Sequence, residues 1–338
     1  MKKILSMSEP KISIFPIYGF VLSILPEDKA EPWIYNAFIQ LRYLDCEHVL
    51  FFELYRSLID GCPYINRTTI ERKQIEKYYD DIFLFIENMI FDNKYIFFHV
   101  DRYYLSFFDE YHKNHIWHEL LIFGFDKKNN IFYCADNGPD GKFCHFTCSY
   151  QEFLEAYNGI DSLRFHMDTH ILEVVNWWNE EDDFLRMDQI YSLLEAYYYS
   201  RANIVFSEPF RSVTYGLNAH YKVLEDVKES QDLIDVRAIC LLLEHKKMMK
   251  ERFRYIYNFQ SIEIWRECFE FYEQLQKKYQ VLRNMMLKYN LLNAGSLEIN
   301  DIVNAFRTNI ELEEKFRDDN FAILKERFEL CGKGKFYE

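Results

Sequence analysis

The most regular pattern in the chain is the helical spacing of apolar residues in its second half. There, apolar positions recur every three or four residues, and charged residues of both signs fill the positions between them. This pattern is typical of amphipathic helices with one buried and one solvated face. The stretches that show it are residues 182–201, 230–258, 261–292 and 296–330. We therefore predict an all-helical domain over residues 173–338.

The first half has a different pattern, with dense runs of aromatic and β-branched residues. Such runs predict strands when turn residues bound them. They cover residues 95–100, 116–125, 130–135 and 143–146. We therefore predict an α+β domain over residues 1–172, with antiparallel strands in its later part.

Three further segments complete the prediction for this domain. Residues 33–58 and 68–88 have helical spacing, with an interruption of the first stretch near Asp45. Ser149-Tyr150-Gln151-Glu152 carries the capping-box signature of another helix. Residues 1–25 are apolar around Gly19 and two prolines, which predicts short strands or an extended arm.

Composition and charge exclude several classes of protein. With 10 Gly and 7 Pro among 338 residues, the chain is neither collagen-like nor rich in linkers. The net charge of −14 is spread over both halves, so we expect no basic face for nucleic acid. No apolar stretch is long enough for a membrane span or a signal peptide. We expect a soluble cytoplasmic protein that binds neither nucleic acid nor membranes.

The cysteines and histidines suggest metal sites only weakly. The eight cysteines are scattered without a CxxC pair, which favours a reducing compartment. Cys144 and Cys148 flank His145 but lack a second pair of ligands. His112, His115 and His118 are spaced by three residues, which places them on alternating faces of a strand. We therefore expect no metal.

A candidate nucleophile lies in the segment predicted as the first long helix. Gln40 precedes Cys46 by six residues, and the spacing predicts that Cys46 lies at a helix start. There the positive end of the helix dipole favours the thiolate, which is the nucleophilic form. A nearby glutamine amide can stabilise the negative charge that develops during acyl transfer.

Two further residues can complete a catalytic group. His118 begins one predicted strand and Asp136 ends the next. If these strands are antiparallel neighbours, the carboxylate can orient the imidazole, which can then deprotonate a thiol. Each residue also has a structural interpretation: Cys46 as a small buried side chain, His118 as a structural histidine and Asp136 as a turn residue.

In this order, the motifs resemble those of a known family. The Gln-x5-Cys motif, His118 before Leu-Leu-Ile-Phe-Gly-Phe-Asp, the Asp136-Asn137 pair and Ser149-x3-Phe resemble the papain-superfamily fold of bacteriocin-processing cysteine peptidases. The stretch 98–105, followed by Tyr111, His115 and His118, is still more similar to the N-terminal domain of the butirosin biosynthesis protein H type. The resemblance covers residues 33–160, which is less than half of the chain.

The resemblance implies an amide-forming acyltransferase of specialised-metabolite biosynthesis, including antibiotics. Such enzymes take an acyl group from a carrier-protein thioester and transfer it to an amine. The implied roles are nucleophile for Cys46, general base for His118, orienting carboxylate for Asp136 and oxyanion donor for Gln40. The implied partners are an acyl or peptidyl carrier protein and a small amine. Phosphopantetheine on the carrier is the only prosthetic group implied, and the chain itself needs no cofactor.

Two alternatives and one further expectation follow. The same residues suit a cysteine peptidase or hydrolase if water accepts the acyl group. Glu47 beside Cys46 opposes thiolate formation, and His48 can offset it, so a non-catalytic binding protein of the same fold stays open. We expect the helical domain to cover the cleft. Its expected acyl-binding lining is Tyr197, Tyr198 and Tyr199 with Trp177 and Trp178.

Overall fold

A computed structural model describes most of the chain. The described residues are 1–53, 58–79, 81–160, 168–175, 185–202, 212–230, 233–292 and 298–333, without the side chains of residues 27, 28 and 330–333. The chain divides into two units, the first formed by Met1–Ala30 and Arg56–Asn179 and the second by Glu31–Tyr55 and Glu180–Glu338. The second unit therefore combines an early segment with the C-terminal half of the chain. A single boundary near residue 172 does not describe this division.

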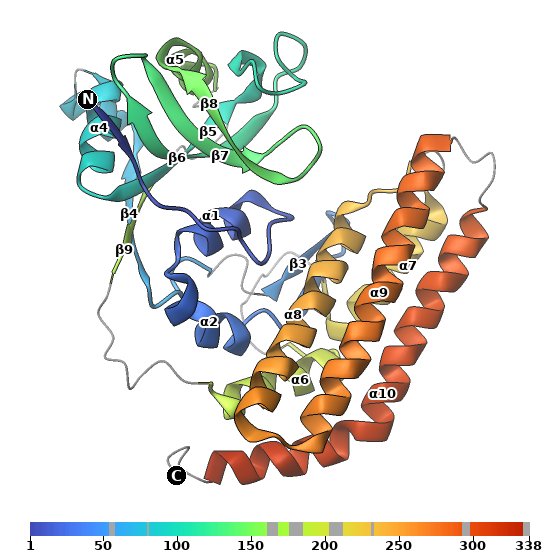
Figure 1. The fold of residues 1–338 in the computed structure, drawn as a ribbon. Coiled ribbons are helices and arrows are strands. Elements are labelled where there is room, and N and C mark those ends of the chain that lie inside the picture. The colour runs from blue at the N-terminus through green and yellow to red at the C-terminus, as the bar shows by residue number, and fades with distance from the viewer. Residues whose placement is uncertain are drawn as a thin grey trace. The chain divides into compact units, whose positions relative to one another are not determined.

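A seven-stranded antiparallel sheet forms the frame of the first unit (Figure 1). Its order is β4-β9-β5-β6-β7-β8, and β1 pairs with β6 outside this path. The strands are β1 (Lys2–Ile4), β4 (Ile65–Glu71), β5 (Lys94–Asp101), β6 (Trp117–Asp126), β7 (Ile131–Asn137), β8 (Phe143–Ser149) and β9 (Asp168–Val174). The four strands predicted from the sequence are confirmed as β5 to β8. β4 instead replaces the start of the helix predicted over residues 68–88.

Helices of the first unit are α1 (Pro16–Ile24), α3 (Arg72–Tyr78), α4 (Ile82–Phe91) and α5 (Tyr150–Asn158). Every residue of α1 is buried, and the helix packs against β6 and β7. A helix that is buried on all sides has no polar face, so its sequence lacks helical periodicity. The extended arm predicted for residues 1–25 is therefore wrong over α1. The predicted capping box is confirmed, since Ser149 and Glu152 cap each other at the start of α5.

The second unit joins a small sheet to a set of helices. The sheet order is β10-β2-β3, formed by β2 (Leu41–Leu44), β3 (Val49–Phe52) and β10 (Val213–Tyr215). The helices are α6 (Met187–Tyr198), α7 (Gly216–Glu229), α8 (Arg237–Gln260), α9 (Glu263–Leu292) and α10 (Ile299–Lys333). Four of these, α6, α8, α9 and α10, were predicted. Helix α2 (Glu27–Asn36) crosses from the first unit to the second.

Side chains of α8 explain why the early segment belongs to this unit. Arg252 is fully buried and donates to the carbonyls of Tyr35 and Ala37, each at 2.6 Å. His245 is also fully buried, and its Nε2 lies 2.8 Å from the carbonyl oxygen of Ile39. These contacts satisfy carbonyl groups at the end of α2 that lack partners within the helix.

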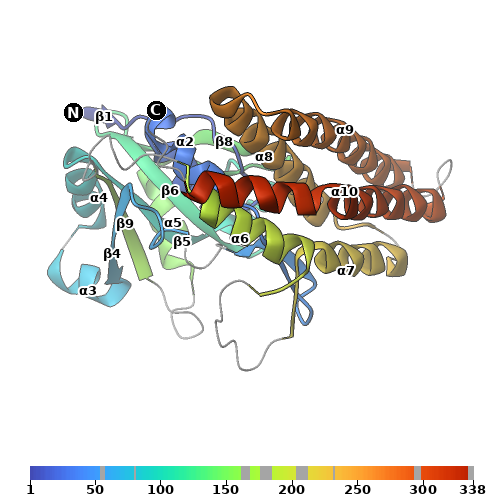
Figure 2. The same cartoon turned by 90° about the horizontal axis from the view of Figure 1, so that it is seen from below.

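The helical core contains a sealed polar cluster. Helix α10 packs against α6, α7 and α9, and α8 packs against α9 (Figure 2). Nζ of Lys246 lies 2.6 Å from Oε2 of Glu313, and both side chains are 0% exposed. The Tyr197 hydroxyl donates to Glu313 at 2.9 Å and accepts from Lys246 at 2.7 Å. Because a buried charge is costly without partners, these bonds favour one packing of the helices.

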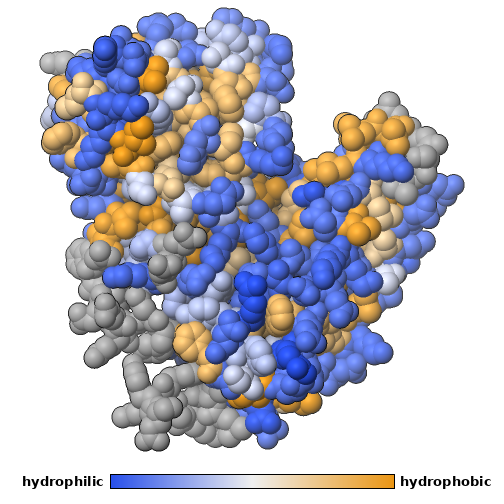
Figure 3. Space-filling view, in the orientation of Figure 1, coloured by the Kyte–Doolittle hydropathy of each residue, from blue (hydrophilic) through white to orange (hydrophobic). Residues whose placement is uncertain are grey.

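The outer faces of the helices are mixed. On the face shown in Figure 3, hydrophobic side chains are scattered among hydrophilic ones over α8 and α9. This is the surface expected of amphipathic helices that contact solvent on one side. Within the described part of the chain, no helix combines the length and apolarity needed to cross a membrane.

Candidate functional site

Strands β6 and β7 bring His118 and Asp136 together. The strands are antiparallel neighbours. His118 lies near the start of β6 and Asp136 near the end of β7, and His118 Nδ1 is 3.1 Å from Asp136 Oδ2. The Asp136 side chain is 1% exposed and the His118 side chain 28% exposed. A buried carboxylate thus contacts an imidazole that solvent can still reach.

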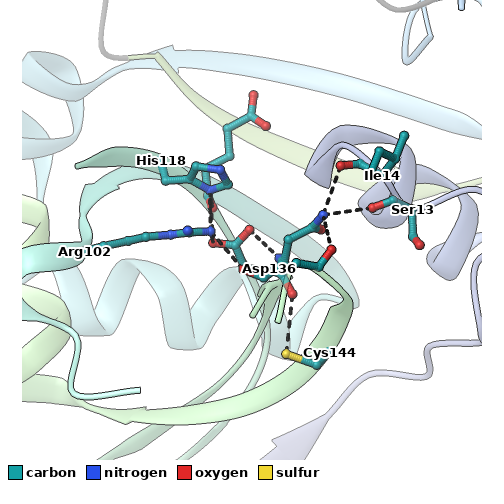
Figure 4. A network of polar contacts seen from close by, with 9 residues as sticks. Ser13, Ile14, Arg102, His118, Asp136 and Cys144 are labelled. Atoms are coloured by element: carbon teal, nitrogen blue, oxygen red, sulfur yellow. Dashed lines mark hydrogen bonds and ion pairs between the residues drawn. The ribbon is translucent and has the colours of Figure 1, made fainter. Parts of the chain in front are cut away.

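Arg102 is part of the same cluster, although the sequence analysis did not identify it (Figure 4). It begins the short 3-10 helix η2 (Arg102–Tyr104), directly after β5. Its Nη2 lies 2.6 Å from Asp136 Oδ2, 2.9 Å from His118 Nδ1 and 3.0 Å from the carbonyl oxygen of Asn137. The guanidinium also packs over the ring of Phe108, 4.2 Å from its centroid. The sequence signal for Arg102 was its position, since it is a basic residue directly after a buried strand that ends in Asp101.

The position of Arg102 bears on the tautomer of His118. A guanidinium N–H can only donate, so a hydrogen bond from Arg102 to His118 requires a lone pair on Nδ1 and a proton on Nε2. A general base oriented by Asp136 needs the opposite tautomer, with Nδ1–H donating to the carboxylate and the lone pair on Nε2. Neutral His118 can adopt only one of these two arrangements at a time. The tautomer of His118 decides whether Nε2 is a hydrogen-bond donor or a base.

Asn137 connects the end of β7 to the chain before α1. Its Nδ2 donates to the carbonyl oxygens of Ser13 at 3.0 Å and Ile14 at 3.1 Å (Figure 4). Its backbone N–H donates to Asp136 Oδ1 at 2.7 Å. Cys144 pairs with Asp136 across β7 and β8, and burial raises the pKa of its thiol. This shift opposes formation of the Cys144 thiolate.

Glu119 adds a titratable group on the other face of the sheet. Successive residues of a strand point to opposite faces, so Glu119 and His118 diverge. Glu119 is paired in register with His99 of β5. Burial raises the pKa of Glu119 to about 7, the charge of His118 opposes this shift and the charge of Asp136 adds to it. Burial also lowers the pKa of His99.

Cys46 lies in the second unit. It is an exposed residue of the turn 45–48 between β2 and β3. The predicted helix over residues 33–58 ends at Asn36, so the placement of Cys46 at a helix start is wrong. No helix dipole acts on the thiol from its own segment. His118 and Asp136 belong to the first unit, so the structure does not join them to Cys46 within one unit.

Gln40 is also in the second unit, directly before β2. Its side chain is buried, with 2% of the residue exposed. Nε2 donates to the carbonyl oxygen of Arg201 at 2.7 Å, and Oε1 accepts from the backbone N–H of Leu41 at 3.0 Å. An oxyanion would have to reach this buried amide and compete with the Arg201 carbonyl.

The expected acyl-binding tyrosines have other surroundings. Tyr197 is 0% exposed and belongs to the Lys246–Glu313 cluster. The Tyr198 hydroxyl lies 2.7 Å from that of Tyr272 inside the helical core. Tyr199 is 45% exposed. Trp177 and Trp178 lie outside the described residues. Tyr197 and Tyr198 therefore pack the core and do not line a tunnel.

The histidines considered for a metal have separate partners. His115 Nδ1 lies 2.6 Å from the buried Asp101 carboxylate, and the ring of His112 stacks on Tyr111 at 4.0 Å. His118 contacts Asp136 instead. In the described ranges, no group of three or more His, Cys, Asp and Glu side chains is arranged to hold a metal ion.

The candidate site therefore consists of Arg102, His118 and Asp136 at the ends of three neighbouring strands. Cys46 is a solvent-accessible thiol in the other unit. This arrangement can bind or transfer a proton at His118, and it can form a thioester at Cys46. No protein-family model and no curated protein matches the chain.

Proposed function

We propose that the protein is an amide-forming acyltransferase with a papain-like first unit. It moves an acyl group from a carrier-protein thioester through acyl-Cys46 to an amine. The observation that supports this most is the 3.1 Å contact between His118 and Asp136 on neighbouring antiparallel strands. When Nδ1 of His118 carries the proton, a carboxylate in this position holds the imidazole ready for proton transfer at Nε2. The accessible thiol of Cys46 supplies the nucleophile.

The reaction has two balanced steps. Cys46 Sγ forms a bond to the thioester carbonyl carbon, and the phosphopantetheine thiol of an acyl or peptidyl carrier leaves. His118 accepts the thiol proton of Cys46 and gives it to that leaving thiolate. The amine nitrogen then attacks acyl-Cys46, His118 accepts an amine proton and passes it to the sulfur, and Cys46 leaves as the thiol. The mechanism requires the turn with Cys46 to reach His118, and it assigns the shielding of the thioester from water to the helical unit.

The test supplies a carrier-bound or short thioester first alone and then with an amine. Mass spectrometry should detect acyl-Cys46, which should decay much faster with amine than in buffer. His118→Ala should slow transfer by about 100-fold or more, and Asp136→Asn should have a milder effect because Asp136 orients and does not react.

Matched variants separate the possible outcomes. Cys46→Ala should form no adduct, whereas Cys240→Ala should behave as the natural protein because Cys240 lies on α8 outside the proposed site. Full transfer activity in Cys46→Ala would exclude the covalent mechanism. Free acid as the main product, at a rate independent of amine, would indicate a hydrolase.

A second candidate function is a non-catalytic binding protein, and Arg102 is the observation that favours it. When Arg102 donates to Nδ1, neutral His118 carries its proton on Nε2 and presents a donor. A donor at that position suits a ligand with a carbonyl or carboxylate oxygen. Nitrogen NMR of His118 distinguishes the tautomers. A proton on Nε2, together with no acylation of Cys46, would favour binding over transfer.

A further inference from the structure

A second pair of a histidine and a carboxylate lies in the same unit as Cys46. His48 Nδ1 is 2.7 Å from Asp226 Oδ1. The Tyr43 hydroxyl donates to Asp226 Oδ2 at 2.5 Å and lies 3.0 Å from His48 Nδ1. Tyr43 comes from β2, Asp226 from α7 and His48 from the turn that contains Cys46. Three separate segments thus converge on this imidazole.

These bonds determine the tautomer of His48. Tyr43 has a single hydroxyl proton, which it donates to Asp226. Asp226 accepts from both partners, so His48 Nδ1 must carry the proton that fills the 2.7 Å contact. In the neutral imidazole the lone pair is then on Nε2, which is the arrangement of a general base held by a carboxylate.

The turn holds Cys46 close to this base. Asp45, at the other end of the turn, accepts from Ser212 Oγ at 2.6 Å and Thr214 Oγ1 at 3.0 Å. His48 has a left-handed backbone with φ of 53°. This conformation is uncommon outside glycine, although histidine tolerates it better than most residues. Cys46 is two residues before His48, so their Cα atoms lie within about 7 Å, and the proposed step requires rotation of the Cys46 side chain to bring Sγ to Nε2.

The charges around His48 favour its protonated form. The hydrogen bond and charge of Asp226 raise the pKa of His48, and Glu229 on α7 and Asp45 in the turn act in the same direction. Tyr43 also contacts the ring, and burial together with the carboxylate of Asp226 raises the pKa of its hydroxyl, which keeps it protonated. An imidazole that accepts the proton of Cys46 is therefore stabilised as imidazolium. This opposes the effect of Glu47 on the thiolate.

We propose that Cys46, His48 and Asp226 form a nucleophile, base and carboxylate contained in the second unit. His48 Nε2 takes the proton from Cys46 Sγ as the sulfur forms its bond to an electrophilic carbon such as a thioester carbonyl. The leaving thiolate departs with the electron pair and takes the proton from the His48 imidazolium. The inference rests on the proposed function only in treating Cys46 as the nucleophile. It gives to His48 the proton of Cys46 that the mechanism above passes through His118, and it leaves to His118 the proton transfer from the amine.

The test measures the alkylation rate of Cys46 by iodoacetamide in the folded full-length protein, from pH 5.5 to 9. In this reaction Sγ bonds to the methylene carbon and iodide leaves. Peptide mapping by mass spectrometry follows Cys46 separately from the other cysteines. His48→Gln should lower the rate at pH 7 by about tenfold and move the pH profile upward, and Asp226→Asn should lower it less. Glu47→Gln should raise it.

Three controls make the result decisive. His118→Gln should leave alkylation unchanged, Tyr43→Phe should stay within about twofold because the His48–Asp226 contact remains, and slow labelling of the buried Cys268 should report that each variant is folded. An unchanged rate and pH profile in His48→Gln, or an equal loss in His118→Gln, would overturn the inference. Alkylation needs no acyl donor, so its dependence on His48 can hold even if acyl transfer fails. Acyl transfer can likewise proceed even if the alkylation rate of Cys46 does not depend on His48.

Discussion

The two histidine–carboxylate pairs look alike in distance but differ in their third partner. Nδ1 lies 3.1 Å from the carboxylate in His118–Asp136 and 2.7 Å in His48–Asp226. The third partner of the first pair is Arg102, which can only donate, and that of the second is Tyr43, whose proton is already given to Asp226. A short contact between an imidazole and a carboxylate therefore does not by itself identify a general base. The neighbour that completes the hydrogen-bond set decides which nitrogen carries the proton.

The two histidine–carboxylate pairs also differ in burial. The Asp136 side chain is 1% exposed and that of Arg102 10%. The side chains of His48 and Asp226 are 66% and 30% exposed. A buried ion pair is costly to break, whereas an exposed pair contributes little to stability. The first pair should therefore matter for both folding and chemistry, and the second mainly for chemistry.

Arg102→Met should have the largest effect on stability. It leaves the buried Asp136 carboxylate without its cationic partner, so we expect a loss of about 2–4 kcal/mol in the free energy of unfolding, measured by urea denaturation. It should also move the His118 proton to Nδ1, because Asp136 becomes the only side chain bonded to that nitrogen, and nitrogen NMR reports this. Asp226→Asn is the matched variant of the exposed pair and should lose much less stability. Equal losses of stability in Arg102→Met and Asp226→Asn would show that burial does not distinguish the two pairs.

Glu119→Gln should have a smaller effect that depends on pH. The folded-state pKa of Glu119 is raised to about 7, so its contribution to stability is present below the unfolded value near 4.5 and is lost as pH rises through about 7. The variant should therefore gain stability relative to the natural protein by about 1–2 kcal/mol between pH 5 and pH 8, as judged by denaturation at each pH. A constant difference across this range would mean that Glu119 titrates normally. The NMR titration of His48 beside Asp226 should be the same in Glu119→Gln as in the natural protein.

The smallest effect should appear in the titration of His48. Asp226 raises the pKa of His48, so the midpoint of its NMR titration should fall toward the usual value in Asp226→Asn. For the same reason the pair stabilises the fold at acidic pH, and this contribution is lost as pH rises through the raised pKa. An unchanged titration midpoint of His48 would mean that its imidazole does not interact with Asp226 in solution.

Local patterns predicted much of this fold. The strands β5 to β8, the capping box of α5 and the helices α8 to α10 follow from side-chain periodicity and from hydrogen bonds between near neighbours. His118 and Asp136 could be placed at the ends of neighbouring strands for the same reason. These features depend on residues that are close in the sequence, where propensities and patterns are informative.

The remaining features depend on distant parts of the chain. Residues 41–52 form strands because β10 pairs with β2, a partner about 170 residues away. The surroundings of the cysteine turn depend on Asp226, 183 residues after Tyr43. Arg102 lies beside His118 because β5 pairs with β6, where Val100 and His118 are in register. No pattern within a short window of sequence contains this information.

The division of the chain also has a consequence for its synthesis. The segment Glu31–Tyr55 leaves the ribosome early, but its partners in β10 and α8 follow only after residues 56–179. Val213 follows Tyr55 by 158 residues, so at about 5–20 residues per second the delay before β10 is made is on the order of 8 to 32 seconds. During this time the apolar hairpin β2–β3 and its thiol have no native partner from the second unit, while the first unit can already assemble its sheet. The nascent hairpin therefore keeps an unpaired strand edge until β10 is made, and a chain truncated after residue 179 would carry that edge permanently unpaired.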